Sequence, residues 1–216
     1  MMDNKADMDS QDDLPSRGRP SRDRKERKAP RPLAPARLEE MALAYVARFA
    51  TSAGKLEAYL ARKLQERGWD GEGDGREAIA ALLARFAELG YVDDAGFARM
   101  RSTSLLRRGY GARRIAQDLN AAGISEAIRS DHAPDEGAAR RAVFALARRK
   151  GLGPFTRGLG EGERLDPALR EKQMASLLRA GHAMGVARAL LAQTSPEEAE
   201  SWVAEAGETP SGGFWD

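Results

Sequence analysis

The sequence predicts an all-α protein built from tandem three-helix repeats that resemble helix-turn-helix units. Hydrophobic residues make up 42% of the chain but aromatic residues only 6%, which favours helices packed closely over Ala and Leu. From Leu38 onward the apolar residues recur with helical spacing, and no segment shows the sustained alternation of a β-strand. Repeated helix ends support stacked units, which together bury faces that no unit buries alone, so we expect an elongated, curved molecule.

The repeat is visible when helix ends are aligned. The matching segments are Leu106-Arg-Arg-Gly109 with Leu178-Arg-Ala-Gly181, Ile115-x3-Leu119 with Val186-x3-Leu190, and Leu60-x3-Leu64-x3-Gly68 with Ile115-x3-Leu119-x3-Gly123. Their agreement in position and order is what favours tandem units over unrelated helices.

Residues 1–36 are predicted to be a disordered tail. Five prolines lie there, among acidic residues first and basic residues afterwards, and the stretch offers too little apolar surface to offset the entropy of ordering. It is either a solubilising extension or a basic arm that adds non-specific affinity for nucleic acid.

Two helices are expected in a first repeat at residues 37–69, and a third helix opens the next unit. Apolar faces recur over residues 38–49 and 56–64, and Gly68 is suited to end the second helix. After a Gly- and Asp-rich loop, a strongly amphipathic helix runs to Gly90. We place the central three-helix repeat at residues 76–124.

An acid pair, Asp93-Asp94, is predicted to start the next helix, over residues 94–108. With Asp93 as N-cap, Val92 and Phe97 take the positions of a hydrophobic staple, and Asp94 favours the helix dipole. No His or further acid nearby completes a ligand set, so the pair indicates a helix start and not a catalytic or metal site.

The segment Gly109-Tyr110-Gly111 is predicted to form a tight corner before a helix at residues 112–122. Gly109 is expected to end the preceding helix in the left-handed conformation. Gly111 then serves as N-cap, and Tyr110 packs onto Ile115. Such a short connection resembles the turn of a helix-turn-helix.

The arginines around this corner are the candidate binding residues. Six arginines and no acid occur between positions 99 and 114: Arg99, Arg101, Arg107, Arg108, Arg113 and Arg114. Arg113 and Arg114 lie in the first turn of their helix, where positive charge opposes the macrodipole. This placement suggests binding of an anionic partner, against the alternative of a solvated basic face. A second basic stretch comprises Arg140, Arg141, Arg148, Arg149 and Lys150.

The remaining chain is predicted to contain a third helical repeat at residues 125–194 and an acidic C-terminal helix and tail at residues 195–216. A helix ends near Gly151, a flexible glycine-rich loop follows, and Asp166-Pro167 opens another helix. No Lys or Arg follows Arg188, so the basic charge lies on the earlier elements.

Several classes of function are disfavoured. The chain has no cysteine, which excludes disulfides and thiolate zinc sites. The glycine loop lacks Gly-Lys-Ser/Thr, which disfavours a phosphate-binding P-loop. His132 and His182 have no neighbouring ligand or nucleophile in the sequence. We expect no enzymatic activity, no metal and no cofactor. No apolar run is long enough to span a bilayer and no signal-peptide core is found, so we expect a cytoplasmic protein without membrane contact.

The run GYVDDAGFARMRSTSLLRRGYGARRIAQDLNAAGIS resembles the central repeat of the RecX family, modulators of the recombinase RecA. The resemblance rests on Leu89, Gly90, Tyr91, Val92, Asp93, Asp94, Phe97, Gly109, Tyr110, Gly111, Arg114, Ile115, Leu119, Gly123 and Ile124. Residues 59–64 also fit the family's Leu-x2-Lys-Leu pattern, and the resemblance covers roughly residues 38–194. The chain departs from the pattern at Gly181-His182, where the family usually has an aromatic residue after the glycine.

The resemblance implies a non-enzymatic regulator that lies on the RecA–single-stranded-DNA filament. It implies modulation, mostly inhibition, of the ATPase, recombinase and coprotease activities of RecA, with weak or indirect contact to single-stranded DNA, and we expect a monomer. The alternative is a stand-alone helix-turn-helix regulator that reads duplex DNA with the helix at residues 112–122. Sequence-specific duplex binding would distinguish the two.

Overall fold

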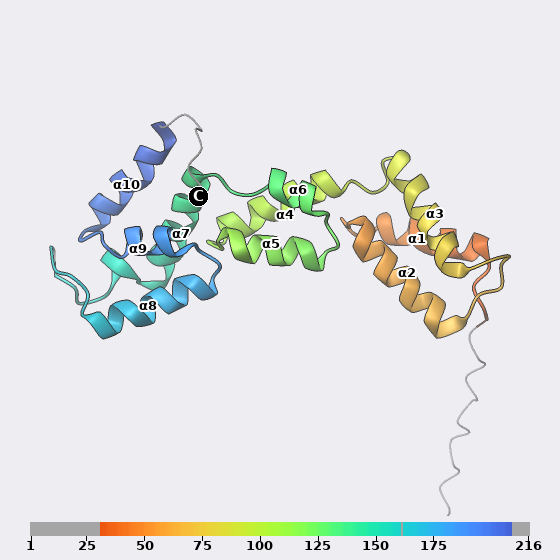
Figure 1. The fold of residues 1–216 in the computed structure, drawn as a ribbon, viewed down its shortest axis with the longest axis horizontal. Coiled ribbons are helices and arrows are strands. Elements are labelled where there is room, and N and C mark those ends of the chain that lie inside the picture. Colours follow the sequence, from red (N-terminus) through yellow and green to blue (C-terminus); the bar gives the residue numbers. More distant parts are fainter. Residues whose placement is uncertain (1–30, 161, 209–216) are drawn as a thin grey trace, which may run out of the picture. The chain divides into compact units, whose positions relative to one another are not determined.

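The computed structural model describes residues 31–160 and 162–208, and these residues form an all-α fold. They contain ten α-helices and one short 3-10 helix (Figure 1). The only extended pairing among them is an isolated parallel bridge between Leu33 and Trp69. The predicted fold class is confirmed. The chain divides into residues 1–30 and 31–216, and most of the predicted tail lies outside the described residues.

The predicted end of the tail at residue 36 is wrong. Leu33 is fully buried, and its backbone pairs with the loop after α2, since Leu33 N–H donates to Gly68 O and Asp70 N–H donates to Leu33 O, both at 3.0 Å. Helix α1 (Pro35–Val46) then begins with a proline in its first turn, where no N–H is required. The first group of helices therefore starts at Leu33.

The first group consists of α1, α2 (Ala53–Arg67) and α3 (Gly75–Glu88). Its core is formed by one apolar face of each helix together with Leu33 and Val92: Leu33, Leu38, Ala42, Leu56, Leu60, Ile79, Leu82, Phe86 and Val92. The assignment of the third helix to the central repeat is therefore wrong. Its apolar stripe packs on α1 and α2, so the first repeat extends well beyond residue 69.

The second group consists of α4 (Asp94–Arg107), α5 (Ala112–Ala121) and α6 (Glu126–Asp131). The six-residue α6 is capped by Ser125 and packs Ile128 against the core of the group. The boundary of the central repeat at residue 124 is therefore also wrong. The observed repeat begins with the Asp93 cap and ends with α6, because Ile128 completes the core over α4 and α5.

The third group consists of α7 (Glu136–Lys150), the 3-10 helix η1 (Gly153–Phe155), α8 (Pro167–Arg179), α9 (Met184–Leu190) and α10 (Pro196–Glu208). The acidic α10 packs on α7, where Arg140 donates to Trp202 O at 2.7 Å. The predicted flexible loop after Gly151 is partly ordered, because Gly153 and Pro154 are buried in η1. The predicted start of α8, with Asp166 as N-cap, is confirmed.

Candidate partner-binding surface

The turn between α4 and α5 has the conformation expected from its glycines. Gly109 has φ 76°, and Tyr110 N–H donates to Leu105 O at 3.1 Å, which closes the end of α4. Gly111 is the N-cap of α5, and Tyr110 packs against the core that contains Ile115. The predicted corner is confirmed, so the ends of α4 and α5 lie close together.

The other motif residues also take their predicted places. Gly90 and Gly123 have positive φ after α3 and α5, and Phe97, Ile115 and Leu119 are buried in the core of the second group. The three buried side chains form the scaffold under the corner, and the two glycines end the helices that precede them.

The acid pair Asp93-Asp94 is structural. The side chain of Asp93 accepts from Gly96 N–H at 2.8 Å, as an N-cap does. Asp94 has a second role, because its carboxylate accepts from Ala53 N–H, at the first residue of α2, at 2.8 Å. It thereby ties the start of α2 to the second group. No local pattern predicts this bond, because its two partners lie 41 positions apart in the chain.

A glycine pair joins the second group to the third. Gly111 N–H donates to Ala180 O at 3.0 Å and Arg113 N–H donates to Gly181 O at 3.1 Å. The backbones approach so closely that a Cβ at Gly111 would lie 2.4 Å from the Gly181 carbonyl. The start of α5 is therefore fixed against the residues that follow α8.

A second glycine pair joins the first group to the second in the same way. A Cβ at Gly54, in the first turn of α2, would lie 2.7 Å from the Cα of Gly123, just after α5. Ser52 Oγ donates to Ala122 O at 2.5 Å across this joint. In both joints the start of a group's second helix meets the end of the next group's second helix, so the repeat includes the joints as well as the helices.

His182 lies at the joint between the second and third groups. It is buried, and its Nε2 donates to Gly109 O at 3.0 Å, which requires the proton on that nitrogen. Burial lowers the pKa of His182, and the bond to Gly109 opposes this shift. The neutral ring therefore links the α4–α5 corner directly to the third group.

Arg101 differs from the other five candidate arginines. Its Nε and Nη2 donate to the two carboxylate oxygens of Asp118 at 2.6 and 2.8 Å. This bidentate pair raises the pKa of Arg101 and lowers that of Asp118. Arg101 thus braces α4 against α5, and its guanidinium is already occupied.

The remaining candidates Arg99, Arg107, Arg108, Arg113 and Arg114 are exposed. Arg108 lies over the ring of Tyr110, 5.4 Å from its centroid. None of the five forms an ion pair with any described residue. We define Arg107, Arg108, Arg113 and Arg114 as the basic corner. An anionic partner can therefore bind it without displacing an internal ion pair.

The described residues contain neither a cluster of metal-ligating side chains nor a membrane-spanning helix. No group of three or more His, Asp or Glu side chains among them is placed to hold a metal ion. None of the described helices is both long and apolar enough to cross a bilayer.

Comparison with known proteins matches this architecture. A family model described as "RecX, second three-helix domain" matches residues 93–131, which span the Asp93 cap and helices α4–α6. The regulatory protein RecX of Myxococcus xanthus (strain DK1622) is 33% identical over 184 residues, which are 82% of this chain and 96% of that protein. The chain belongs to the RecX family.

The chain is also similar to two further RecX proteins, one in sequence and one in structure. The regulatory protein RecX of Mycobacterium sp. (strain KMS) is 35% identical over 114 residues, covering 51% of this chain and 59% of that protein. The crystal structure of RecX from Lactobacillus salivarius superposes with a TM-score of 0.58 at 16% identity, over 77% of this chain and 97% of that one. The helical architecture is therefore that of a solved RecX structure.

Proposed function

We propose that this chain binds the RecA–single-stranded-DNA filament and modulates RecA, mostly by inhibiting its ATPase, recombinase and coprotease activities. It acts without catalysis of its own, as a cytoplasmic monomer. The observation that carries the proposal is the exposed basic corner on the central repeat of a RecX-family chain. Arg113 and Arg114 oppose the dipole of α5 there, so their position is unfavourable for the helix and favourable for an anionic partner.

The joints support this use of the corner. The bonds from Gly111 and Arg113 to the third group fix the start of α5, and His182 fixes the turn through Gly109 O. The two helix ends that display the arginines are therefore positioned before a partner arrives. Such preorganisation reduces the entropic cost of binding.

The direct test is a titration of RecA ATPase activity on single-stranded DNA with the full-length chain. We expect turnover to slow at sub-stoichiometric protein, and unchanged turnover at equimolar protein would refute the proposal. A chain lacking residues 1–30, tested in parallel, measures any contribution of the basic arm.

Charge reversal at the corner tests the site itself. We expect Arg113→Glu with Arg114→Glu to weaken filament binding by roughly tenfold or more, since attraction becomes repulsion, while helical circular dichroism is retained. Arg76→Glu is the matched control, because Arg76 is exposed and also lies in the first turn of a helix, α3. Equal affinities of the double variant and the parent would refute the assignment.

The alternative function is sequence-specific duplex binding by the α4–α5 corner. A recognition helix presents its N-terminal residues to the bases, but the first turn of α5 is bonded to Ala180 and Gly181. The third group therefore hinders entry of this helix end into a major groove, whereas the exposed side chains of Arg113 and Arg114 can still contact a surface, which favours the filament proposal. Binding that discriminates one duplex site from others by several kcal/mol would reverse this preference.

A further inference from the structure

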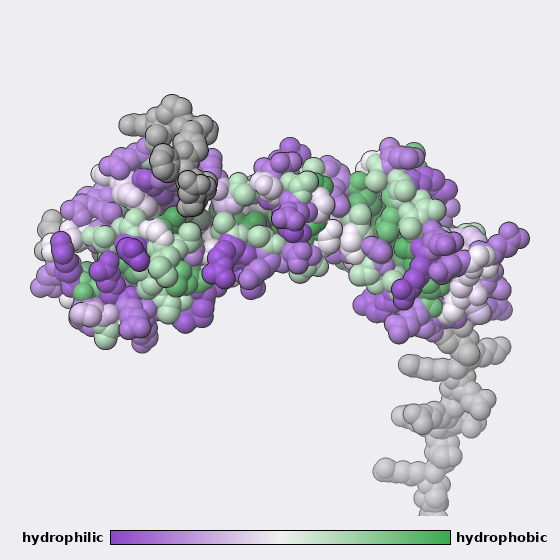
Figure 2. Space-filling view, viewed as in Figure 1, coloured by the Kyte–Doolittle hydropathy of each residue, from purple (hydrophilic) through white to green (hydrophobic). Residues whose placement is uncertain are grey.

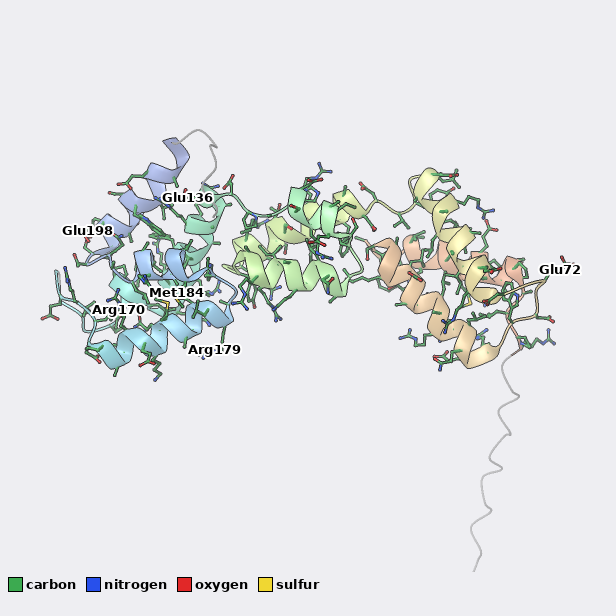
Figure 3. The ribbon with its side chains drawn as sticks, viewed as in Figure 1. Glu72, Glu136, Arg170, Arg179, Met184 and Glu198 are labelled. Atoms are coloured by element: carbon green, nitrogen blue, oxygen red, sulfur yellow. The ribbon has the colours of Figure 1, made fainter. Side chains whose placement is uncertain are left out.

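A second cationic feature lies in the third group, in a groove between the end of α7, η1 and α8. The groove has a volume of about 680 Å³, within the range of ligand pockets. Its lining consists of Arg148, Arg149, Lys150, Gly151, Leu152, Phe155, Thr156, Arg157, Leu169, Lys172, Gln173, Ser176 and Arg179. Figure 3 labels Arg170 and Arg179 on α8, and Figure 2 shows hydrophilic residues mixed with hydrophobic ones over the third group.

The groove is strongly basic. Six of its lining residues are cations and none is an acid: Arg148, Arg149, Lys150, Arg157, Lys172 and Arg179. Arg149 donates to Arg108 O at 2.8 Å, and the other five form no ion pair with any residue that the structure describes. Like charges gathered in one concavity repel each other, so the groove favours an anionic occupant.

Helix stability accounts for only part of this charge. Arg148, Arg149 and Lys150 lie in the last turn of α7, and Arg179 lies in the last turn of α8, where cations favour the helix dipole. Lys172 lies in the middle of α8, and Arg157 follows η1. These two cations have no such role, yet they face the same groove.

The floor of the groove is fixed and its polar atoms are satisfied. The buried side chain of Gln173 accepts from Gly153 N–H at 2.6 Å and donates to Thr156 Oγ1 at 2.9 Å. Phe155 packs edge-on against Phe144, with ring centroids 5.3 Å apart. The groups that remain for a ligand are therefore the surrounding cations, the Ser176 hydroxyl and the apolar surface of Leu152, Phe155 and Leu169.

We propose that this groove binds the phosphodiester backbone of single-stranded DNA. Proteins that bind single strands combine a cationic groove with aromatic or apolar surface for the bases, and both features are present here. The bond from Arg149 to Arg108 O places the groove next to the basic corner, so the cations continue beyond the groove, as a continuous polyanion requires. This inference rests on the proposed function, because the RecA–single-stranded-DNA filament is where the chain would contact single-stranded DNA.

Two competing occupants fit less well. A duplex presents phosphates on a rigid, wide surface that does not enter a concavity of this size. An acidic peptide would satisfy the cations, but it would not use the apolar floor as unstacked bases do. Four of the six cations are arginines, whose planar fork matches phosphate oxygens.

The test uses the full chain and a fluorescent oligothymidine, with binding measured by anisotropy at several salt concentrations and without RecA. The variant is Arg157→Ala with Lys172→Ala, which spares the cations at the helix ends. Each phosphate contact adds about 0.7 to the slope of log affinity against log salt concentration for a single strand, so loss of two contacts should reduce that slope by about 1.4. If the variant and the parent bind alike at 1 M salt, the variant should therefore bind about 25-fold more weakly than the parent at 0.1 M salt.

Arg170→Ala is the matched control, since Arg170 is exposed on the same helix but does not line the groove. It is expected to leave both the affinity and the slope nearly unchanged. Equal losses in the double variant and the control would overturn the proposal, because they would indicate general electrostatic attraction. The proposal would also be overturned if a duplex or an acidic peptide bound more tightly than oligothymidine, or if millimolar ATP displaced the oligothymidine completely. The ligand that bound more tightly, or ATP, would then be the better candidate for the groove.

The result is separable from the proposed function. If the double variant binds oligothymidine as the parent does but the parent still inhibits RecA, the groove assignment fails alone. If the parent leaves RecA turnover unchanged but binds oligothymidine through the groove, the filament proposal fails alone.

Discussion

Replacing Gly111 with alanine tests whether the glycine joint fixes the basic corner. The added Cβ would lie 2.4 Å from Gly181 C, Gly181 O and His182 N, whereas ordinary contacts lie near 3.5 Å or beyond. The backbones must therefore separate by about 1 Å. Gly111 has φ −86°, which alanine adopts readily, so the effect reports the close approach and not backbone strain.

The magnitude follows from what the separation breaks. The bonds from Gly111 N–H and Arg113 N–H, at 3.0 and 3.1 Å, would lengthen beyond hydrogen-bond range, at about 1 kcal/mol each. Residual overpacking adds about 1–3 kcal/mol. We therefore expect Gly111→Ala to lower the free energy of unfolding by about 3–5 kcal/mol.

The assay combines urea denaturation, followed by circular dichroism, with amide hydrogen exchange. Exchange at the Gly111 and Arg113 amides reports the joint even if the groups unfold separately. Gly111→Ser is the first control, because it restores a favourable N-cap but keeps the Cβ. Gly185→Ala is the second, because Gly185 lies in α9 with open space around it, and it should stabilise by about 0.5–1 kcal/mol.

The reasoning would be refuted by Gly111→Ala unfolding within about 0.5 kcal/mol of the parent with unchanged exchange at both amides. Full recovery in Gly111→Ser would also refute it, since the loss would then come from the cap and not from the contact with Gly181.

Three further predictions concern the same scaffold. Burial lowers the pKa of His182 in the folded state below its ordinary 6.5, so the stability that the neutral ring contributes is complete above pH 6.5 and is lost as the pH falls below it. We expect the free energy of unfolding to fall over this range in the parent and to vary less with pH in His182→Gln. Leu33→Ala should lower the free energy of unfolding of the first group, measured by urea denaturation, by about 2–5 kcal/mol. A loss below about 0.5 kcal/mol would contradict the role of Leu33 in the core of this group. Arg101→Ala should lower stability by about 1 kcal/mol or more without the loss of filament affinity seen at Arg113 and Arg114; an equal loss of affinity would place Arg101 in the contact surface.

Local signals in the sequence are enough to predict where α4 and α5 start and end. The Asp93 cap, the left-handed Gly109 and the Gly111 start depend on neighbouring residues within one turn, so a single sequence reveals them. Helix α6 is not predicted from the sequence, because a segment of six residues is too short to show a helical period. The loop after Gly151 was expected to be flexible, since nothing local indicates that Gln173 holds η1.

The repeat boundaries could not be predicted for a different reason. The amphipathic face of α3 is compatible with packing on either neighbour, and only its contact with α1 and α2 decides the group to which it belongs. The predicted tail extends too far, to residue 36, because prolines such as Pro35 occur both in disordered segments and in the first turn of helices. The burial of Leu33 settles the choice, through a bridge to Trp69 that is distant in the chain.

The sequence by itself determined the all-α class, the positions of most helices, the capped corner and the presence of its arginines, because helix periodicity and capping are local. Tertiary structure decided which arginines are available to a partner, since Arg101 is paired with Asp118, which lies 17 positions away in the chain. It also decided the glycine joints, the burial of His182 and the convergence of α7, η1 and α8 on one cationic groove. These features depend on close approaches between segments far apart in the chain, and a one-dimensional pattern does not record them.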